Sequence, residues 1–184
     1  MIFLGIGSVL IFALFSVKTE SKSEGPTMMQ NWTRFDALFK KYGKLYMVDW
    51  QMLKAIAMNE SSLGSVKSVA HGIMYPSDIE ASKSQDGKSW GLMQVTLTTA
   101  RDLDPTASAE KLNTPEYSIK LAAQYLGTLY KQFMLIDSRF IEAVVKSYNQ
   151  GPGNTRKELS GKSEGFADEY WDRYQRNYEK VVKG

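Results

Sequence analysis

Cysteine is absent from the 184-residue chain, and histidine occurs only once, as His71. Without cysteine the chain cannot form a disulfide framework, a thiolate zinc site, an iron–sulfur cluster or a cysteine nucleophile. One histidine is too few for a histidine-rich catalytic zinc, and a Ser-His-Asp triad would have to use that single residue. Chemistry is left mainly to carboxylates, hydroxyls, amides and lysines, and we expect neither a metal nor a cofactor.

An excess of charge is also missing. The formal net charge is only +3, and no basic run alternates with aromatic residues. Nucleic acid is therefore not an expected partner. The chain is 43% hydrophobic and 23% charged, which is typical of a globular protein, and its length suits one domain with a substantial core.

Charged side chains are absent from residues 1–17, which read MIFLGIGSVLIFALFSV. As a helix this segment would span about 25 Å, the short end of what crosses a bilayer. We expect residues 1–17 to be a single membrane-spanning anchor. A cleaved signal peptide is the alternative, although no Lys or Arg precedes the apolar stretch and no A-x-A-like site follows it.

The remaining chain divides into a linker and a domain. Residues 18–31 are polar, and Gly25-Pro26 would break a helix, so this segment is expected to be a linker. Hydrophobic residues then follow mostly helical spacing, with no strong strand alternation, which predicts an all-α domain over residues 32–184. The expected helices cover residues 32–46, 49–61, 98–103, 115–133, 139–148 and 167–182.

Capping residues fix some of these boundaries. Asp49 is a suitable N-cap, and Thr114 is followed by Pro115, which is favoured at the first position of a helix. The helix from Arg139 is expected to end at Tyr148, because Asn-Gln-Gly-Pro-Gly follows it.

Glu60 is the unusual residue of its helix. It lies seven positions after Leu53, four after Ile56 and three after Ala57, so it continues their apolar stripe. Burial disfavours an ionised carboxylate and raises its pKa, and a neutral carboxyl is what a general acid needs. On geometry alone, a partly exposed residue at a helix end is the more common interpretation.

Three short motifs occur in order: Glu60-Ser61, the Gly-Leu-Met-Gln of residues 91–94, and the Tyr-Asn-Gln-Gly of residues 148–151. Together they resemble the soluble lytic transglycosylases (SLT type), which have the goose-type lysozyme-like fold. The resemblance covers residues 50–174. It implies an enzyme that cleaves the glycan strands of peptidoglycan.

The resemblance also implies roles around the reacting bond. Glu60 corresponds to the single catalytic acid/base, and Ser61 to a helper that hydrogen-bonds near its carboxyl. Tyr148 corresponds to the phenol that touches this carboxyl.

Further positions are implied to bind substrate. Met93 and Gln94 resemble the pair that lines the floor of the sugar groove, and Asn149 resembles the amide that orients the substrate. Tyr170 resembles a cleft-lining tyrosine of the last helix. A plain core position is the alternative for Met93 and for Tyr148.

The number of carboxylates separates two reaction types. Hydrolysis would be natural with a second acid facing Glu60, and Asp78 and Asp86 lie in a polar stretch, although in no recognisable motif. A single glutamate suits an intramolecular reaction, which the resemblance implies: cleavage between N-acetylmuramic acid and N-acetylglucosamine with formation of a 1,6-anhydromuramyl end. A hydrolytic lysozyme on the same fold and a non-catalytic wall-binding module are the alternatives.

The expected location follows from the anchor and the substrate. The domain should face peptidoglycan, in a bacterial periplasm or at a phage virion membrane. Lys18 and Lys22 weakly favour retention of the domain in the cytoplasm, which conflicts with that location. A phage particle or a secretion complex would supply partners for local opening of the wall, and the phage particle would remove the conflict.

Overall fold

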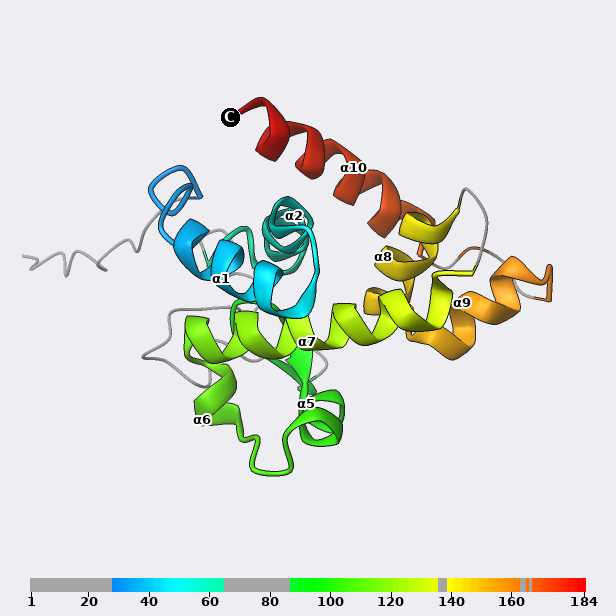
Figure 1. Cartoon of the computed structure of the whole chain (residues 1–184), viewed down its shortest axis with the longest axis horizontal. Helices are drawn as coiled ribbons and strands as arrows, with labels where there is room; N and C mark the ends of the chain where they lie inside the picture. The colour runs from blue at the N-terminus through cyan, green and yellow to red at the C-terminus, as the bar shows by residue number, and fades with distance from the viewer. Residues whose placement is uncertain (1–27, 65–86, 136–138, 163–164, 166) are drawn as a thin grey trace, which may run out of the picture.

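A computed structural model describes residues 28–64, 87–135, 139–162, 165 and 167–184. Its elements, labelled in Figure 1, are α1 (Asp36–Tyr46), α2 (Trp50–Ser61), β1 (Ser89–Trp90), β2 (Val95–Thr96), α5 (Leu97–Leu103), α6 (Ala109–Leu112), α7 (Pro115–Phe133), α8 (Phe140–Gln150), α9 (Pro152–Leu159) and α10 (Asp168–Lys183). The expected helical fold is confirmed, with one addition. Ser89 and Trp90 pair antiparallel with Thr96 and Val95 around the turn that carries residues 91–94.

Helix α7 runs across the middle of the molecule, with α1, α2 and α10 on one side and α5 and α6 on the other (Figure 1). The core around it is built from side chains that helical spacing places on one face of each helix. The largest fully buried side chains are Phe39, Met52, Leu53, Ile56, Leu63, Met93, Leu112, Ile119, Leu121, Leu126, Leu129 and Phe133.

Two predicted helices are confirmed closely. The Asp49 carboxylate accepts a hydrogen bond from the Gln51 amide at 2.9 Å, so α2 begins as the capping signal predicts. Helix α7 occupies residues 115–133 with Pro115 in its first turn, although the Thr114 side chain makes no capping bond to it.

Two predicted boundaries need correction, and one helix was not predicted. The helix expected from residue 32 begins only at Asp36, because residues 28–35 form turns. Helix α8 continues through Asn149 to Gln150, and Gly151, with a φ of 83°, ends it instead. No helix was predicted directly after α8, but Pro152 starts helix α9.

The folded domain also extends further back than residue 32. Asn31 is 2% exposed, and its amide donates to the Leu63 carbonyl at 2.8 Å, just after α2. The last residue of the expected linker therefore belongs to the packed domain, because a buried amide is stable only when it is hydrogen-bonded.

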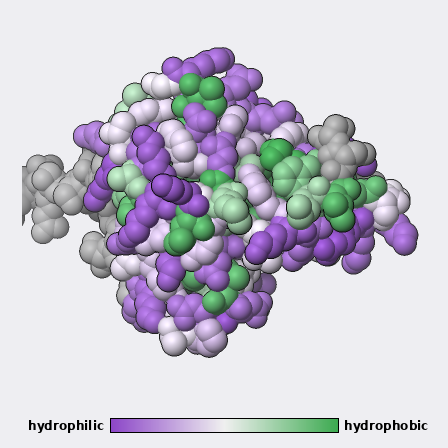
Figure 2. All heavy atoms as spheres, viewed as in Figure 1, coloured by the Kyte–Doolittle hydropathy of each residue, from purple (hydrophilic) through white to green (hydrophobic). Residues whose placement is uncertain are grey.

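The expected anchor over residues 1–17 and most of the expected linker lie outside the described residues. Within the described part of the chain, no helix is both long and apolar enough to cross a bilayer. The face in Figure 2 is mostly hydrophilic, and hydrophobic surface gathers on the side where α7 ends and α8 begins. Met134, Leu135 and Ile141 are among the exposed large hydrophobic residues.

Candidate active site

Glu60 lies in the last turn of α2, with Tyr170 of α10 against it. The Tyr170 hydroxyl donates a hydrogen bond to Glu60 Oε1 at 2.6 Å. The Tyr170 side chain is buried, whereas Glu60 keeps partial access to solvent. The carboxyl is therefore held in place from the protein side, while the residue as a whole keeps a partly exposed surface.

The surroundings of Glu60 change its acidity. Loss of solvent around the carboxyl raises its pKa from 4.5 to about 7, against the opposing influence of the Tyr170 hydrogen bond and the positive charge of Arg173. Burial also raises the pKa of the Tyr170 phenol well above its usual range, so this group stays a donor. A carboxyl with a pKa near neutrality can both give and accept a proton at physiological pH. The raised pKa that the apolar stripe predicts for Glu60 is thus present in the structure.

Helix α10 is fixed to α2 by amides beside the acid. Asn59 donates its side-chain N–H to the Tyr170 carbonyl at 3.1 Å, and Asn177 donates to Asn59 Oδ1 at 2.8 Å. Because Asn59 directly precedes Glu60, these bonds set the distance between the Tyr170 hydroxyl and the carboxyl.

The phenol that touches the carboxyl is Tyr170, and the prediction that Tyr148 fills this position is corrected. The Tyr148 hydroxyl, on α8, instead donates a hydrogen bond to the Met93 carbonyl in the turn of residues 91–94, at 2.8 Å. Tyr148 still lies close enough for the Glu60 charge to raise its pKa further, after burial has done so. Tyr148 therefore ties α8 to the turn of residues 91–94 beside the acid.

The turn of residues 91–94 supports the wall of the site. Gly91 has a φ of 74°, and a Cβ there would lie 1.9 Å from the Leu112 carbonyl oxygen, so only glycine fits. Met93 is fully buried, which corrects its predicted place on the groove floor to a core position beneath it. Gln94 also has a positive φ, 48°, and its amide donates to the Gly91 carbonyl at 2.9 Å.

A hollow of about 190 Å³ lies between β2, α5, α7 and the end of α8. It brings together two predicted substrate residues, Gln94 and the exposed Asn149, with Tyr148. Its full lining is Gln94, Val95, Thr96, Thr99, Tyr125, Tyr148, Asn149 and Gly151. Amides, hydroxyls and aromatic faces are the groups that bind sugars through hydrogen bonds and ring stacking.

A larger hollow, of about 350 Å³, lies at the opposite end of α2. Asp49, Trp171 and Tyr178 are among its lining residues, and Glu60 is not. Asp49 and Glu60 are separated by about 16 Å along a helix, given a rise of about 1.5 Å per residue. Glu60 lines neither hollow; the smaller one is linked to the acid through Tyr148, whose pKa the Glu60 charge raises further.

Ser61 holds the end of α2. Its hydroxyl donates to the Ala57 carbonyl at 3.2 Å and accepts from the Gly64 amide at 3.0 Å, and the residue is 1% exposed. The predicted helper role near the carboxyl remains a prediction. Asp78 and Asp86 lie outside the described residues.

Arg173 was not predicted from the sequence. It lies three positions after Tyr170 on α10, and its guanidinium carbon is 5.6 Å from the centre of the Tyr170 ring. The spacing is a usable signal, since residues three apart share a helix face.

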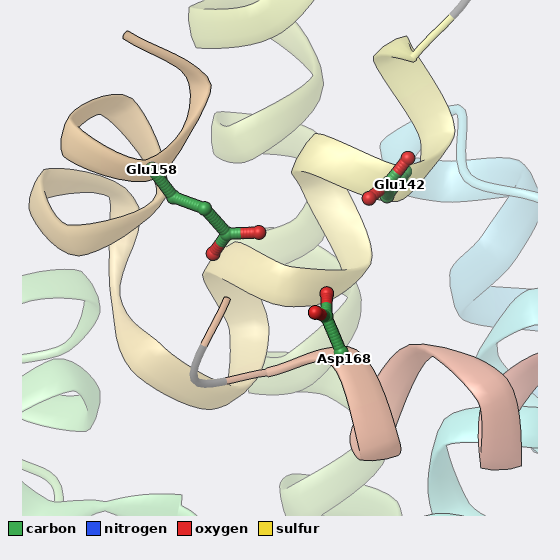
Figure 3. Close-up of side chains that lie close together, drawn as sticks. All are labelled: Glu142, Glu158 and Asp168. Atoms are coloured by element: carbon green, nitrogen blue, oxygen red, sulfur yellow. The ribbon is translucent and has the colours of Figure 1, made fainter. Parts of the chain in front are cut away.

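One cluster of carboxylates resembles a metal site. Glu142 of α8, Glu158 of α9 and Asp168 of α10 place carboxylate oxygens within 4.8 Å of one another, and Figure 3 shows the three groups pointing toward a common centre. The ammonium of Lys146, a residue that is 4% exposed, bonds all three: Glu142 at 2.8 Å, Glu158 at 2.5 Å, and Asp168. A lysine thus already supplies the positive charge that the cluster requires.

Comparison with known families shows what kind of protein carries this site. Residues 37–170 match the family described as the transglycosylase SLT domain, which spans both Glu60 and Tyr170. The chain belongs to the SLT transglycosylase domain family, as the three motifs indicate, and this family membership identifies a transglycosylase-type enzyme that acts on peptidoglycan. Comparison with curated proteins gave no significant match.

Proposed function

We propose that the chain is a lytic transglycosylase in which Glu60 serves first as the acid and then as the base. The observation that carries this proposal is the desolvated Glu60 carboxyl, with a pKa of about 7 and an orienting bond from Tyr170. Among the described residues, the groups that perturb this pKa are Tyr170 and Arg173, and no second carboxylate is one of them. A mechanism with one carboxyl group therefore fits the site.

In the proposed reaction Glu60 first donates a proton and then takes one back. Protonated Glu60 gives its proton to the oxygen between C1 of N-acetylmuramic acid and C4 of N-acetylglucosamine, and the C1–O bond breaks. The 2-acetamido group of the same sugar stabilises the positive charge that develops at C1. The carboxylate of Glu60 then takes the proton of the muramyl C6 hydroxyl as its oxygen bonds to C1. The acid is regenerated, and the product is a 1,6-anhydromuramyl end.

Product mass tests the proposal. Sacculi digested with the full chain should release fragments that are lighter by one water than the hydrolysis products, and the Glu60→Gln protein should release none. Fragments carrying the additional water would identify the hydrolytic lysozyme instead. Binding without release of any fragments by the wild-type protein would identify a wall-binding module.

For its location, we propose that residues 1–17 anchor the domain to a membrane facing peptidoglycan, where it opens the wall locally for a phage particle or a secretion apparatus. The support is the uncharged apolar N-terminal segment. A reporter fused to the C-terminus tests the orientation. Activity of a periplasm-dependent reporter is the expected result, and activity only of a cytoplasm-dependent reporter would contradict it.

A further inference from the structure

Arg173 is a cation next to the candidate acid Glu60, whose pKa it lowers. The residue is exposed on α10, and its guanidinium lies over the ring of Tyr170, whose hydroxyl bonds Glu60. Among the residues that the structure describes, Arg173 forms no ion pair. Lys146 of α8, by contrast, forms ion pairs with three carboxylates.

Catalysis by Glu60 does not explain this arginine. A positive charge nearby favours the ionised carboxylate and lowers the pKa of Glu60, although the first step needs the protonated form. Stacking on Tyr170 does not require a charge either, because the phenol is already fixed by the bond to Glu60 and by the Asn59 bond to its backbone. The charge of Arg173 is therefore available to a ligand bound beside Glu60.

We propose that Arg173 binds a carboxylate carried by the muramyl residue next to the scissile bond, and so selects muramyl glycans over neutral amino-sugar polymers. The inference rests on the proposed function for the nature of the substrate. A guanidinium can form two parallel hydrogen bonds with a carboxylate, which makes it the preferred side chain for such a group. The muramyl lactyl ether carries a carboxylate when no peptide is attached, and the stem peptide carries carboxylates when one is.

Substrate binding would also prepare the acid. A carboxylate paired with Arg173 offsets its positive charge and thereby weakens the influence that keeps Glu60 ionised. Glu60 would then hold its proton more firmly when an anionic muramyl residue is bound. A neutral polymer in the same groove would leave Arg173 unpaired and Glu60 more acidic.

Binding to matched glycans tests the proposal without turnover. Glu60→Gln protein is titrated with peptide-free strands that carry the free lactyl carboxylate, with the same strands after conversion of that carboxylate to a methylamide, and with peptide-bearing strands. Each titration is repeated with Arg173→Gln added. Arg176→Gln provides the control, because it removes an equal charge from an exposed position one turn further along α10.

Arg173→Gln should weaken binding of carboxylate-bearing strands about tenfold and leave methylamide strands unchanged, since a charge-assisted pair is roughly twice as strong as a neutral bond. Loss on the peptide-free strands assigns the lactyl carboxylate, and loss confined to peptide-bearing strands assigns the stem peptide. Arg173→Lys should recover part of the loss, and Arg176→Gln should cause none. An equal loss of affinity for carboxylate and methylamide strands, or no loss for any strand, would overturn the proposal. Because binding is measured with the inactive protein, a wrong reaction type would not alter this result.

Discussion

Glu60 and Lys146 are both ionisable side chains held within the same set of helices, yet their surroundings have opposite consequences. Glu60 meets one phenol and a nearby guanidinium, and burial raises its pKa to about 7. Burial would lower the pKa of Lys146, but the hydrogen bonds that its ammonium donates to Asp168, Glu142 and Glu158 outweigh burial and raise that pKa instead. One group can therefore change its charge near neutral pH, whereas the other is kept ionised.

The difference shows that the candidate acid and the ion pairs that hold the helices together lie in separate clusters. The three carboxylates around Lys146 come from α8, α9 and the first turn of α10, so one ammonium joins three helices (Figure 3). Tyr170 follows Asp168 by only two residues on α10. The ion pairs of Lys146 thus fix the start of α10, the helix whose Tyr170 hydroxyl bonds Glu60.

The largest effect is expected at the acid itself. Glu60→Gln keeps the shape of the side chain and an acceptor for Tyr170, but cannot transfer a proton. General acid–base assistance contributes about 10²–10⁴-fold, so release of anhydromuropeptides should fall by at least about 100-fold while the circular dichroism spectrum stays unchanged. Near-wild-type turnover by this variant would remove Glu60 from the mechanism.

Lys146→Met should be the most destabilising change, because three carboxylates lose their counter-ion while Lys146 itself is buried. Removing one partner of a buried ion pair costs roughly 3–5 kcal/mol, and the partial exposure of these carboxylates reduces this to about 3 kcal/mol. Urea unfolding measures it. Lys183→Met is the matched control, since Lys183 also pairs with a glutamate four residues away but lies 76% exposed, and less than about 0.5 kcal/mol is expected. Equal losses in the two variants would show that the cluster is not a support.

The protonation of Glu60 should appear in the pH dependence of stability. Its pKa is raised from 4.5 to about 7 by folding, so the stability that the protonated form provides is present below pH 4.5 and lost as pH rises through about 7. Glu60→Gln has no such loss, and its stability relative to wild type should rise by up to about 3 kcal/mol across that window. Unfolding at several pH values measures this difference. The exposed Glu169→Gln change on α10 is the control, and a flat difference for both variants would contradict the raised pKa.

The smallest effect is expected at the phenol. Tyr170→Phe removes the hydrogen bond that favours the ionised carboxylate, so the pKa of Glu60 should rise and the fall of activity at alkaline pH should move upward. At pH 6, where Glu60 is mainly protonated, we expect up to about a tenfold lower kcat, because the carboxyl is less well oriented and a neutral hydrogen bond contributes about 0.5–1.5 kcal/mol.

Tyr178→Phe is the control for the phenol, because Tyr178 also lies on α10 and donates to a carboxylate, Asp49, at 2.7 Å. Its pH profile should match that of wild type. A shift of the same size in both variants would mean that the Tyr170 bond has no special influence on the acid.

Local signals in the sequence were sufficient for much of the fold. The Asp49 cap located α2, and Pro115 at the first helical position located α7, because both signals depend only on neighbouring residues. The apolar spacing from Trp32 overestimated α1, since it does not reveal that Asn31 is tied to the end of α2. Pro152 is part of the sequence that predicts the end of the preceding helix, and proline is also favoured in the first turn of a helix, where the structure has it.

The site was predictable only in part, for the same reason. Glu60 was singled out by its place on an apolar stripe together with the Glu60-Ser61 motif and the family resemblance, and the stripe and the motif are both local in the sequence. Which tyrosine reaches it depends on how α10 and α8 pack against α2, and no local spacing decides between Tyr148 and Tyr170. Arg173 was missed because an exposed arginine near a chain terminus usually has no role.

Direct titration of the Glu60 carboxyl tests the central claim most closely. A carbon-13 label in the glutamate side chains, with Glu60 assigned by comparison with Glu60→Gln, allows its resonance to be followed by NMR from acid to alkaline pH. We expect a midpoint near 7 in the folded protein, against 4.5 for an ordinary glutamate. A midpoint close to 4.5 would mean that the carboxyl is ionised at neutral pH, and it would contradict the role of Glu60 as the acid that starts the reaction.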